Sequence, residues 1–256
     1  SLKHLGEAPL DDVLKMWEGL GYYNRAKNLH KTASLVQSLP NEIDELIKLP
    51  GIGKNTAHAI AAFAFKQPVP IMEANVKRIL CRLYKIKTPK EKELWELAYD
   101  LVDTVNPFDY NQAMMDIGAT ICLPKNPKCE SCPLNELCKG KEEPTLYPTK
   151  KRRIVPTREE KILVRVYDNK LSLTQRDGKF LHGLWGFESV EVPHCASEKI
   201  GEVSHVYTHF KLKCDVYVYY ESTPEQENYF DEEEIEKLAI SKVDEKIVKL
   251  LSKIEL

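Results

Sequence analysis

The stretch Leu49-Pro50-Gly51-Ile52-Gly53-Lys54 decides how the first half of this chain folds. Apolar residues keep helical spacing before it, over residues 43–47, and again after it, over residues 56–63. The glycines between allow one tight turn, because glycine adopts backbone conformations that other residues avoid. No side chain on Gly51 or Gly53 blocks a ligand, and the N–H groups that begin the second helix form an anion site. The stretch predicts two helices joined by a turn that binds DNA phosphate; the alternative is an ordinary helix–helix connection.

Helical spacing extends to both sides of this turn and predicts that residues 1–120 are all-helical. The expected helices lie at about 10–20, 26–36, 43–47, 56–63, 74–84, 91–104 and 109–120. After residue 157 the period of apolar residues changes to two, most clearly over residues 212–220, and a helix over 243–251 closes the chain. The predicted fold class is α+β: a helical domain over 1–140, a linker over 141–157 and a small α/β domain over 158–256.

Composition narrows the class of protein. The chain has 256 residues, 43% of them hydrophobic, and a net charge of −2. No apolar run approaches the ~20 residues of a membrane span, so we expect no membrane partner. Seven cysteines, an odd number in a long charged chain, argue against a disulfide scaffold and favour a cytoplasmic protein. A basic run, Lys150-Lys151-Arg152-Arg153, lies within the linker and is either a solvated face or a nucleic-acid contact.

Four of the cysteines form a metal-binding pattern, Cys122-x6-Cys129-x2-Cys132-x5-Cys138. Four thiolates within 17 residues can close around one metal centre. Zinc sites built from four cysteines have two short pairs, whereas this pattern has one. A [4Fe–4S] cluster also takes four thiolates, and the spacing alone leaves both metals open. The other three cysteines lie in apolar patterns and are expected to be small core residues: Cys81, Cys195 and Cys214.

The glycine turn followed by the cysteine pattern resembles the helix–hairpin–helix DNA glycosylases that carry a [4Fe–4S] cluster. Finer motifs resemble the adenine DNA glycosylases, the MutY-like branch. These motifs are Trp17–Tyr23, Asn75–Arg78, Asn111–Gly118 and Gly183–Phe187. The resemblance covers essentially the whole chain. It implies an all-α glycosylase domain with an iron–sulfur loop at 122–138, ligated by Cys122, Cys129, Cys132 and Cys138, and a Nudix-like C-terminal domain.

The resemblance implies a DNA-repair enzyme. The family acts on double-stranded DNA, flips out an adenine mispaired with 8-oxoguanine or guanine, and hydrolyses its glycosidic bond with two carboxylates. We expect such a protein to act as a monomer. At the family's Asp this chain has Glu73, with Asn75 in support. The family's other catalytic residue, an upstream Glu, has no counterpart after Ser1, so we expect an incomplete N-terminus and weak or no catalysis. The alternative function is a DNA-damage-binding module that does not cut.

A related branch, which resembles endonuclease III, cleaves the strand through a lysine that forms a Schiff base. That lysine stands two positions after the second hairpin glycine, where this chain has Asn55. An amide cannot be that nucleophile. The resemblance therefore predicts a monofunctional glycosylase.

The resemblance also assigns DNA contacts. Tyr22 matches a tyrosine that wedges into the duplex, since aromatic rings stack on bases. The other expected backbone contacts are Gly51, Gly53, Lys54, Asn55, Lys77 and Arg78. The stretch Tyr207-Thr208-His209 stands where the family has a turn that reads 8-oxoguanine. The C-terminal domain lacks the Nudix metal-binding pattern, so no pyrophosphatase chemistry is expected there.

Overall fold

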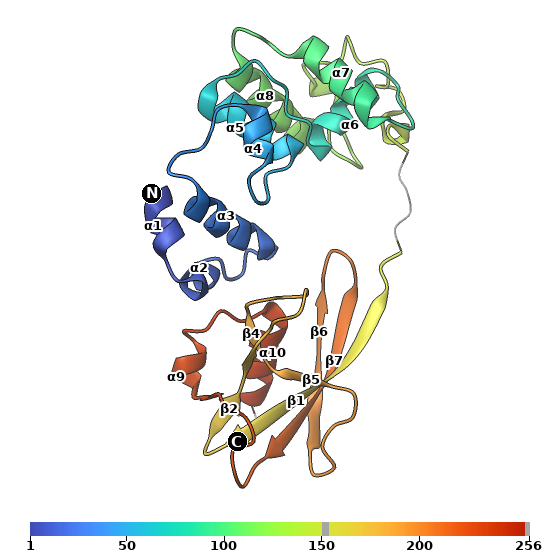
Figure 1. Cartoon of the computed structure of the whole chain (residues 1–256). Helices are drawn as coiled ribbons and strands as arrows, with labels where there is room; N and C mark the ends of the chain where they lie inside the picture. Colours follow the sequence, from blue (N-terminus) through green and yellow to red (C-terminus); the bar gives the residue numbers. More distant parts are fainter. Residues whose placement is uncertain (150–153, 254–256) are drawn as a thin grey trace. The chain divides into compact units, whose positions relative to one another are not determined.

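The computed structural model (Figure 1) describes residues 1–149 and 154–253. Its contacts group into two units, one of Ser38–Arg152 and one that joins Ser1–Gln37 with Arg153–Leu256. The basic run predicted at 150–153 lies outside the described residues. No helix in the described ranges is long and apolar enough to cross a membrane.

The unit of residues 38–152 is helical, as predicted. Its helices are α4 Ile43–Ile47, α5 Lys54–Phe65, α6 Ala74–Leu83, α7 Glu91–Leu101 and α8 Pro107–Asp116. The helix expected over 109–120 begins earlier and continues from Ile117 to Ile121 as a π-helical turn, η1. Helix α6 is strongly amphipathic, and its buried side chains Val76, Ile79 and Leu80 pack with Leu94 and Trp95 of α7.

The cysteine-rich segment follows η1 and has little regular structure. It contains two short 3₁₀ turns, η2 Cys129–Ser131 and η3 Pro144–Leu146. The Lys139 N–H donates to the Leu83 carbonyl at 3.1 Å, which ties the segment to the end of α6.

The C-terminal part is built on a mixed sheet, so the predicted α+β class is confirmed. The strands are β1 Thr157–Tyr167, β2 Lys170–Ser172, β3 Thr174–Gln175, β4 Trp185–Gly186, β5 Glu188–Val190, β6 Glu198–Val206, β7 Lys211–Tyr220 and β8 Tyr229–Phe230. The main sheet has the order β6-β7-β1-β2-β8, with β5 also pairing with β1. Strands β1 and β7 run parallel, with Ile162 opposite Val216, while the β1–β2 and β6–β7 pairs are antiparallel. A short ribbon pairs β3 with β4.

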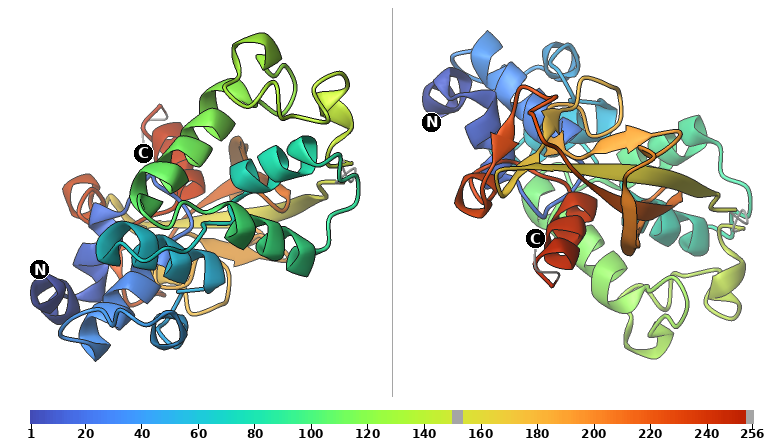
Figure 2. Two further views of the ribbon diagram at one scale, coloured as in Figure 1. Left: turned by 90° about the horizontal axis from the view of Figure 1, so that it is seen from above. Right: turned by 90° about the horizontal axis from the view of Figure 1, so that it is seen from below.

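Two short helices complete this part, α9 Glu232–Ile235 and α10 Lys242–Leu251. Helix α10 lies along one face of the sheet (Figure 2), where its Val243, Ile247 and Leu251 join the core of inward-facing strand residues. Of the three cysteines expected in cores, Cys81 and Cys214 are buried. The expectation for Cys195 is wrong: it is exposed, in the loop that precedes β6.

The first 37 residues form α1 Leu2–Glu7, α2 Leu10–Met16 and α3 Asn24–Leu35. Helix α1 was not predicted, and α2 ends at Met16 rather than near residue 20. Buried residues of these helices share a cluster with Leu184 and Ala239 of the C-terminal part. The grouping of contacts therefore differs from the predicted division at residue 140, because the N-terminal helices pack with the sheet-bearing part.

Candidate functional site

The glycine turn presents free backbone donors at the start of α5. Gly51 has a φ of 73°, a conformation that favours glycine. Gly53 is the N-cap residue of α5, and no side chain of the described residues caps the helix there. A Cβ built on Gly53 would meet no heavy atom within 4 Å, so the surface over the turn is open. The first N–H groups of α5 lack helical partners and can bind an anion such as phosphate.

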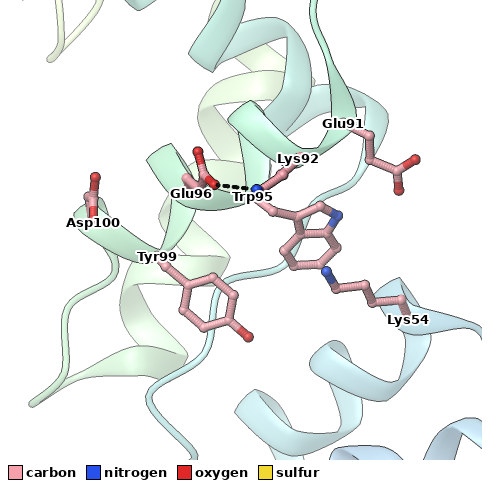
Figure 3. Close-up of a pocket in the computed structure, with 7 residues that line it drawn as sticks. All are labelled: Lys54, Glu91, Lys92, Trp95, Glu96, Tyr99 and Asp100. Atoms are coloured by element: carbon pink, nitrogen blue, oxygen red, sulfur yellow. Dashed lines mark ion pairs between the residues drawn. The ribbon is translucent and has the colours of Figure 1, made fainter.

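The charge of Lys54 is held beside this turn by an aromatic ring. Its Nζ lies 3.9 Å from the centroid of Trp95 of α7, a cation–π contact that Figure 3 shows. Trp95 is 6% exposed, and its indole N–H has no hydrogen-bond partner among the described residues. Asn55 is exposed at the start of α5, as its predicted contact with DNA requires.

Buried His58 links α5 to α7 beneath this surface. Its Nδ1 lies 2.8 Å from the Lys54 carbonyl, which can only accept, so Nδ1 carries the proton. Its Nε2 then accepts from the Tyr99 hydroxyl at 2.8 Å. Burial lowers the pKa of His58. The bond to the Lys54 carbonyl opposes this shift, and the nearby Lys54 charge lowers the pKa further. The neutral imidazole therefore acts as a fixed link between the two helices.

Glu73, the predicted catalytic carboxylate, is the N-cap residue of α6. Its side chain is exposed and makes no capping hydrogen bond. The backbone before it is held by Asn111 of α8, which is 2% exposed. The Ile71 N–H donates to Asn111 Oδ1 at 2.8 Å, and Asn111 Nδ2 donates to the Val69 carbonyl at 2.9 Å. Asn111 is thus a positioning residue that sequence analysis missed, although it begins one of the motifs that carry the resemblance.

Arg78 is half-exposed and makes hydrogen bonds to neighbouring segments, so its contact with phosphate stays a prediction. Its Nε donates to the Cys122 carbonyl at 2.7 Å, and its Nη2 donates to Asn75 Oδ1 at 2.9 Å and to the Gly118 carbonyl at 2.6 Å. These bonds use the Nε and Nη2 atoms of the guanidinium. Asn75 lies so close to η1 that a Cβ on Gly118 would come within 2.5 Å of the Asn75 Cβ. Asn75 and Arg78 therefore connect the start of α6 to the cysteine segment, and Lys77 stays half-exposed.

The four predicted ligands line one cavity together with buried Arg82. They are Cys122, Cys129, Cys132 and Cys138. No three His, Cys, Asp or Glu side chains of the described residues are arranged to hold one metal ion. A tetrahedral zinc ion would draw its four sulfurs to within about 3.8 Å of each other, since Zn–S bonds are about 2.3 Å. Four thiols that line one cavity fit a metal centre with four thiolate ligands, either zinc or a [4Fe–4S] cluster.

Tyr22 and Thr208, which lie 186 residues apart in sequence, meet in the other unit. The Tyr22 hydroxyl is 2.6 Å from Thr208 Oγ1, and both side chains are exposed. Tyr22 is 64% exposed and has a φ of 49°, which is uncommon outside glycine. The two residues predicted to contact the damaged pair thus form one surface feature.

Tyr207 does not share this surface. Its ring packs against Phe180, Phe210 and His205, with centroid distances of 5.1, 5.1 and 4.5 Å. Its hydroxyl is buried without a hydrogen-bond partner in the described residues, and burial raises its pKa to about 12. The predicted base-reading role is therefore corrected: Tyr207 anchors the turn from inside, while Thr208 and His209 are exposed.

Comparisons with known proteins agree with this geometry. Residues 1–103 match the HhH-GPD superfamily of base excision DNA repair proteins, and residues 122–138 match the iron–sulfur binding domain of endonuclease III. The chain is 39% identical to an adenine DNA glycosylase of Buchnera aphidicola, covering 71% of this chain and 54% of that one. It is 33% identical to an adenine DNA glycosylase of Arabidopsis thaliana, covering 81% and 42%.

A solved structure of a thermostable thymine-DNA glycosylase aligns with a TM-score of 0.51 at 32% identity, covering 56% of this chain and 70% of that one. The chain spans about half the length of the first Buchnera relative and less of the Arabidopsis one. The match over 122–138, which spans the four cysteines, settles the choice that spacing left open in favour of an iron–sulfur cluster over zinc.

Proposed function

Because the chain belongs to the helix–hairpin–helix superfamily of base-excision DNA repair proteins, we propose that it removes adenine mispaired with 8-oxoguanine or guanine. The proposed substrate is double-stranded DNA, bound in part through the N–H groups that begin α5. Action as a monomer and a cytoplasmic, DNA-associated location stay predictions.

The contact between Tyr22 and Thr208 carries the assignment to this substrate. An exposed aromatic ring can stack beside a base, and an adjacent hydroxyl can bond to a base edge. Since each hydroxyl orients the other, the pair is preorganised to meet one base of the duplex. The similarity to adenine DNA glycosylases supports the proposal that this base is the guanine opposite the target adenine.

Glu73 supplies the charge for the proposed reaction. Loss of a protonated adenine leaves a positively charged sugar, which a carboxylate stabilises before water attacks. Asn55 in place of a lysine supports hydrolysis without a Schiff base. The chain therefore releases adenine and leaves the strand intact.

The test is single-turnover release of adenine from a duplex with adenine opposite 8-oxoguanine, with an A:T duplex as the control. Release should occur on the mispair only, and Glu73→Gln should slow it by on the order of 100-fold, as loss of one stabilising group does. No adduct should be trapped by borohydride. Release from A:T at the same rate, or a trapped adduct, contradicts the proposal.

A second function, damage binding without cleavage, is favoured by one observation. Glu73 is one methylene longer than the family's Asp, and displacement of a catalytic group by ~1 Å can cost about 100-fold in rate. Specific binding to the mispair with no release, together with release by Glu73→Asp, would support this second function over the first.

A further inference from the structure

We propose that Arg82 tunes the iron–sulfur cluster by donating an N–H group to the sulfur of its ligand Cys122, and so makes the cluster easier to reduce. The proposal concerns the cluster loop alone and holds whether or not the chain releases adenine.

Arg82 is buried and lines the cavity that the four cysteines share. Arg82 is 3% exposed, and its Nη1 lies 3.2 Å from Cys122 Sγ. The same nitrogen donates to the Leu123 carbonyl at 2.8 Å. The other two nitrogens donate to backbone carbonyls of the cysteine-rich segment. Nε donates to the Pro144 carbonyl at 2.8 Å and to the Tyr147 carbonyl at 3.3 Å, and Nη2 donates to the Pro124 carbonyl at 3.3 Å.

These hydrogen bonds fix the orientation of the Arg82 guanidinium. Its planar fork is held by backbone carbonyls just after Cys122 and by others beyond Cys138, and arginine stays charged in proteins. A positive charge is therefore fixed against one sulfur, in an interior where electrostatic interactions are stronger than in water.

The sign of the effect follows from the charge on the cluster. One-electron reduction adds a negative charge to the cluster and its thiolates, and hydrogen bonds to the sulfurs raise the potential of such clusters. Arg82 stabilises the reduced state more than the oxidised one, so its removal should lower the potential.

Two other cations lie near the cavity. Arg78 also contacts Cys122, at its carbonyl, and is therefore kept in every variant. Lys141 lines the same cavity, but it is exposed and donates to Asn135 Oδ1 at 3.3 Å. Lys141→Gln is therefore a matched control that removes one positive charge from the same segment in contact with water, where charge is screened.

The experiment compares Arg82→Gln, Arg82→Lys and Lys141→Gln in the full chain. Iron content and absorbance near 400 nm per chain report cluster loading, and voltammetry reports the potential. In Arg82→Gln the ratio of oxidised to reduced cluster at a fixed potential should rise at least tenfold, which is about 59 mV for one electron. Lys141→Gln should change the ratio less than about twofold, because its charge is screened.

Arg82→Lys keeps the charge, but the shorter set of donors cannot reach the Cys122 sulfur and the carbonyls together. The reduction potential of the cluster in this variant should therefore fall as well, but by less than in Arg82→Gln. A fully loaded Arg82→Gln with the potential of the parent chain overturns the proposal. If Arg82→Gln retains no iron, Arg82→Lys decides: a lowered potential supports the contact, and an unchanged potential overturns it.

Discussion

Asn111 illustrates at the residue scale how one buried amide positions the proposed catalytic Glu73. Its side chain satisfies the Ile71 N–H and the Val69 and Pro107 carbonyls. We predict that Asn111→Ala destabilises the fold by about 2–3 kcal/mol, because buried backbone groups lose their partners.

Urea unfolding measures this cost. Gln112→Ala is the neighbouring control, since Gln112 donates to Asp116 Oδ1 on the surface, and it should cost less than about 0.5 kcal/mol. Equal costs for the two variants would show that Asn111 does not hold the segment before Glu73.

His58 makes a second residue-scale prediction, on pH. Burial lowers its pKa below the ordinary 6.5, so the unfolded chain takes up this proton more readily than the folded chain. Stability therefore falls as the pH drops through 6.5 towards the folded pKa, with a slope of at most about 1.4 kcal/mol per pH unit for one proton.

Unfolding midpoints between pH 7 and pH 5 test this expectation. His58→Gln should flatten the dependence, while His4→Gln, at an exposed site, should leave it unchanged. A parent chain and a His58→Gln variant with the same pH dependence would contradict it.

At the scale of elements, a substitution in the glycine hairpin should change the affinity for DNA without changing the stability of the fold. Gly53 has an extended backbone and open space around it, so Gly53→Ala should fold with little change in melting temperature. The new methyl group stands where phosphate must approach the N–H groups of α5. We predict a loss of DNA affinity on the order of tenfold, or about 1.4 kcal/mol.

Fluorescence anisotropy with a labelled duplex measures the affinity. Gly178→Ala, also in open space but in the other unit, is the control and should bind DNA as the parent chain does. Unchanged binding by Gly53→Ala would remove the hairpin from the DNA interface.

Periodicity predicted most elements because each depends on local spacing. Residues 43–47 and 74–84 became α4 and α6, and residues 212–220 became β7. The π-helical turn at Ile117–Ile121 was missed, since it depends on contacts of Gly118 with Asn75 and Arg78 that spacing does not encode.

At the scale of the whole molecule, the N-terminal helices share a hydrophobic cluster with loop residues of the sheet-bearing part. Leu14 is fully buried in a cluster with Leu184 and Ala239. We predict that Leu14→Ala costs about 2–5 kcal/mol, as removal of a buried leucine side chain does, and that the C-terminal part unfolds with it.

Near-UV circular dichroism and urea unfolding would follow this change. Met16→Ala in the same helix is the control, because Met16 is 89% exposed and should be nearly neutral. Independent unfolding of the C-terminal part, unaffected by Leu14→Ala, would show that the first 37 residues do not support it.

The sequence by itself determined the α+β class, the glycine hairpin and the cysteine motif, because each rests on residue type at short spacing. Only the tertiary structure decided which side chains those elements offer to DNA. It bonded Arg78 to the Cys122 carbonyl, buried the Tyr207 hydroxyl and brought Tyr22 to Thr208. It also placed Arg82 against Cys122. The physical reason is that a side chain's direction depends on partners far along the chain, and spacing carries no information about them.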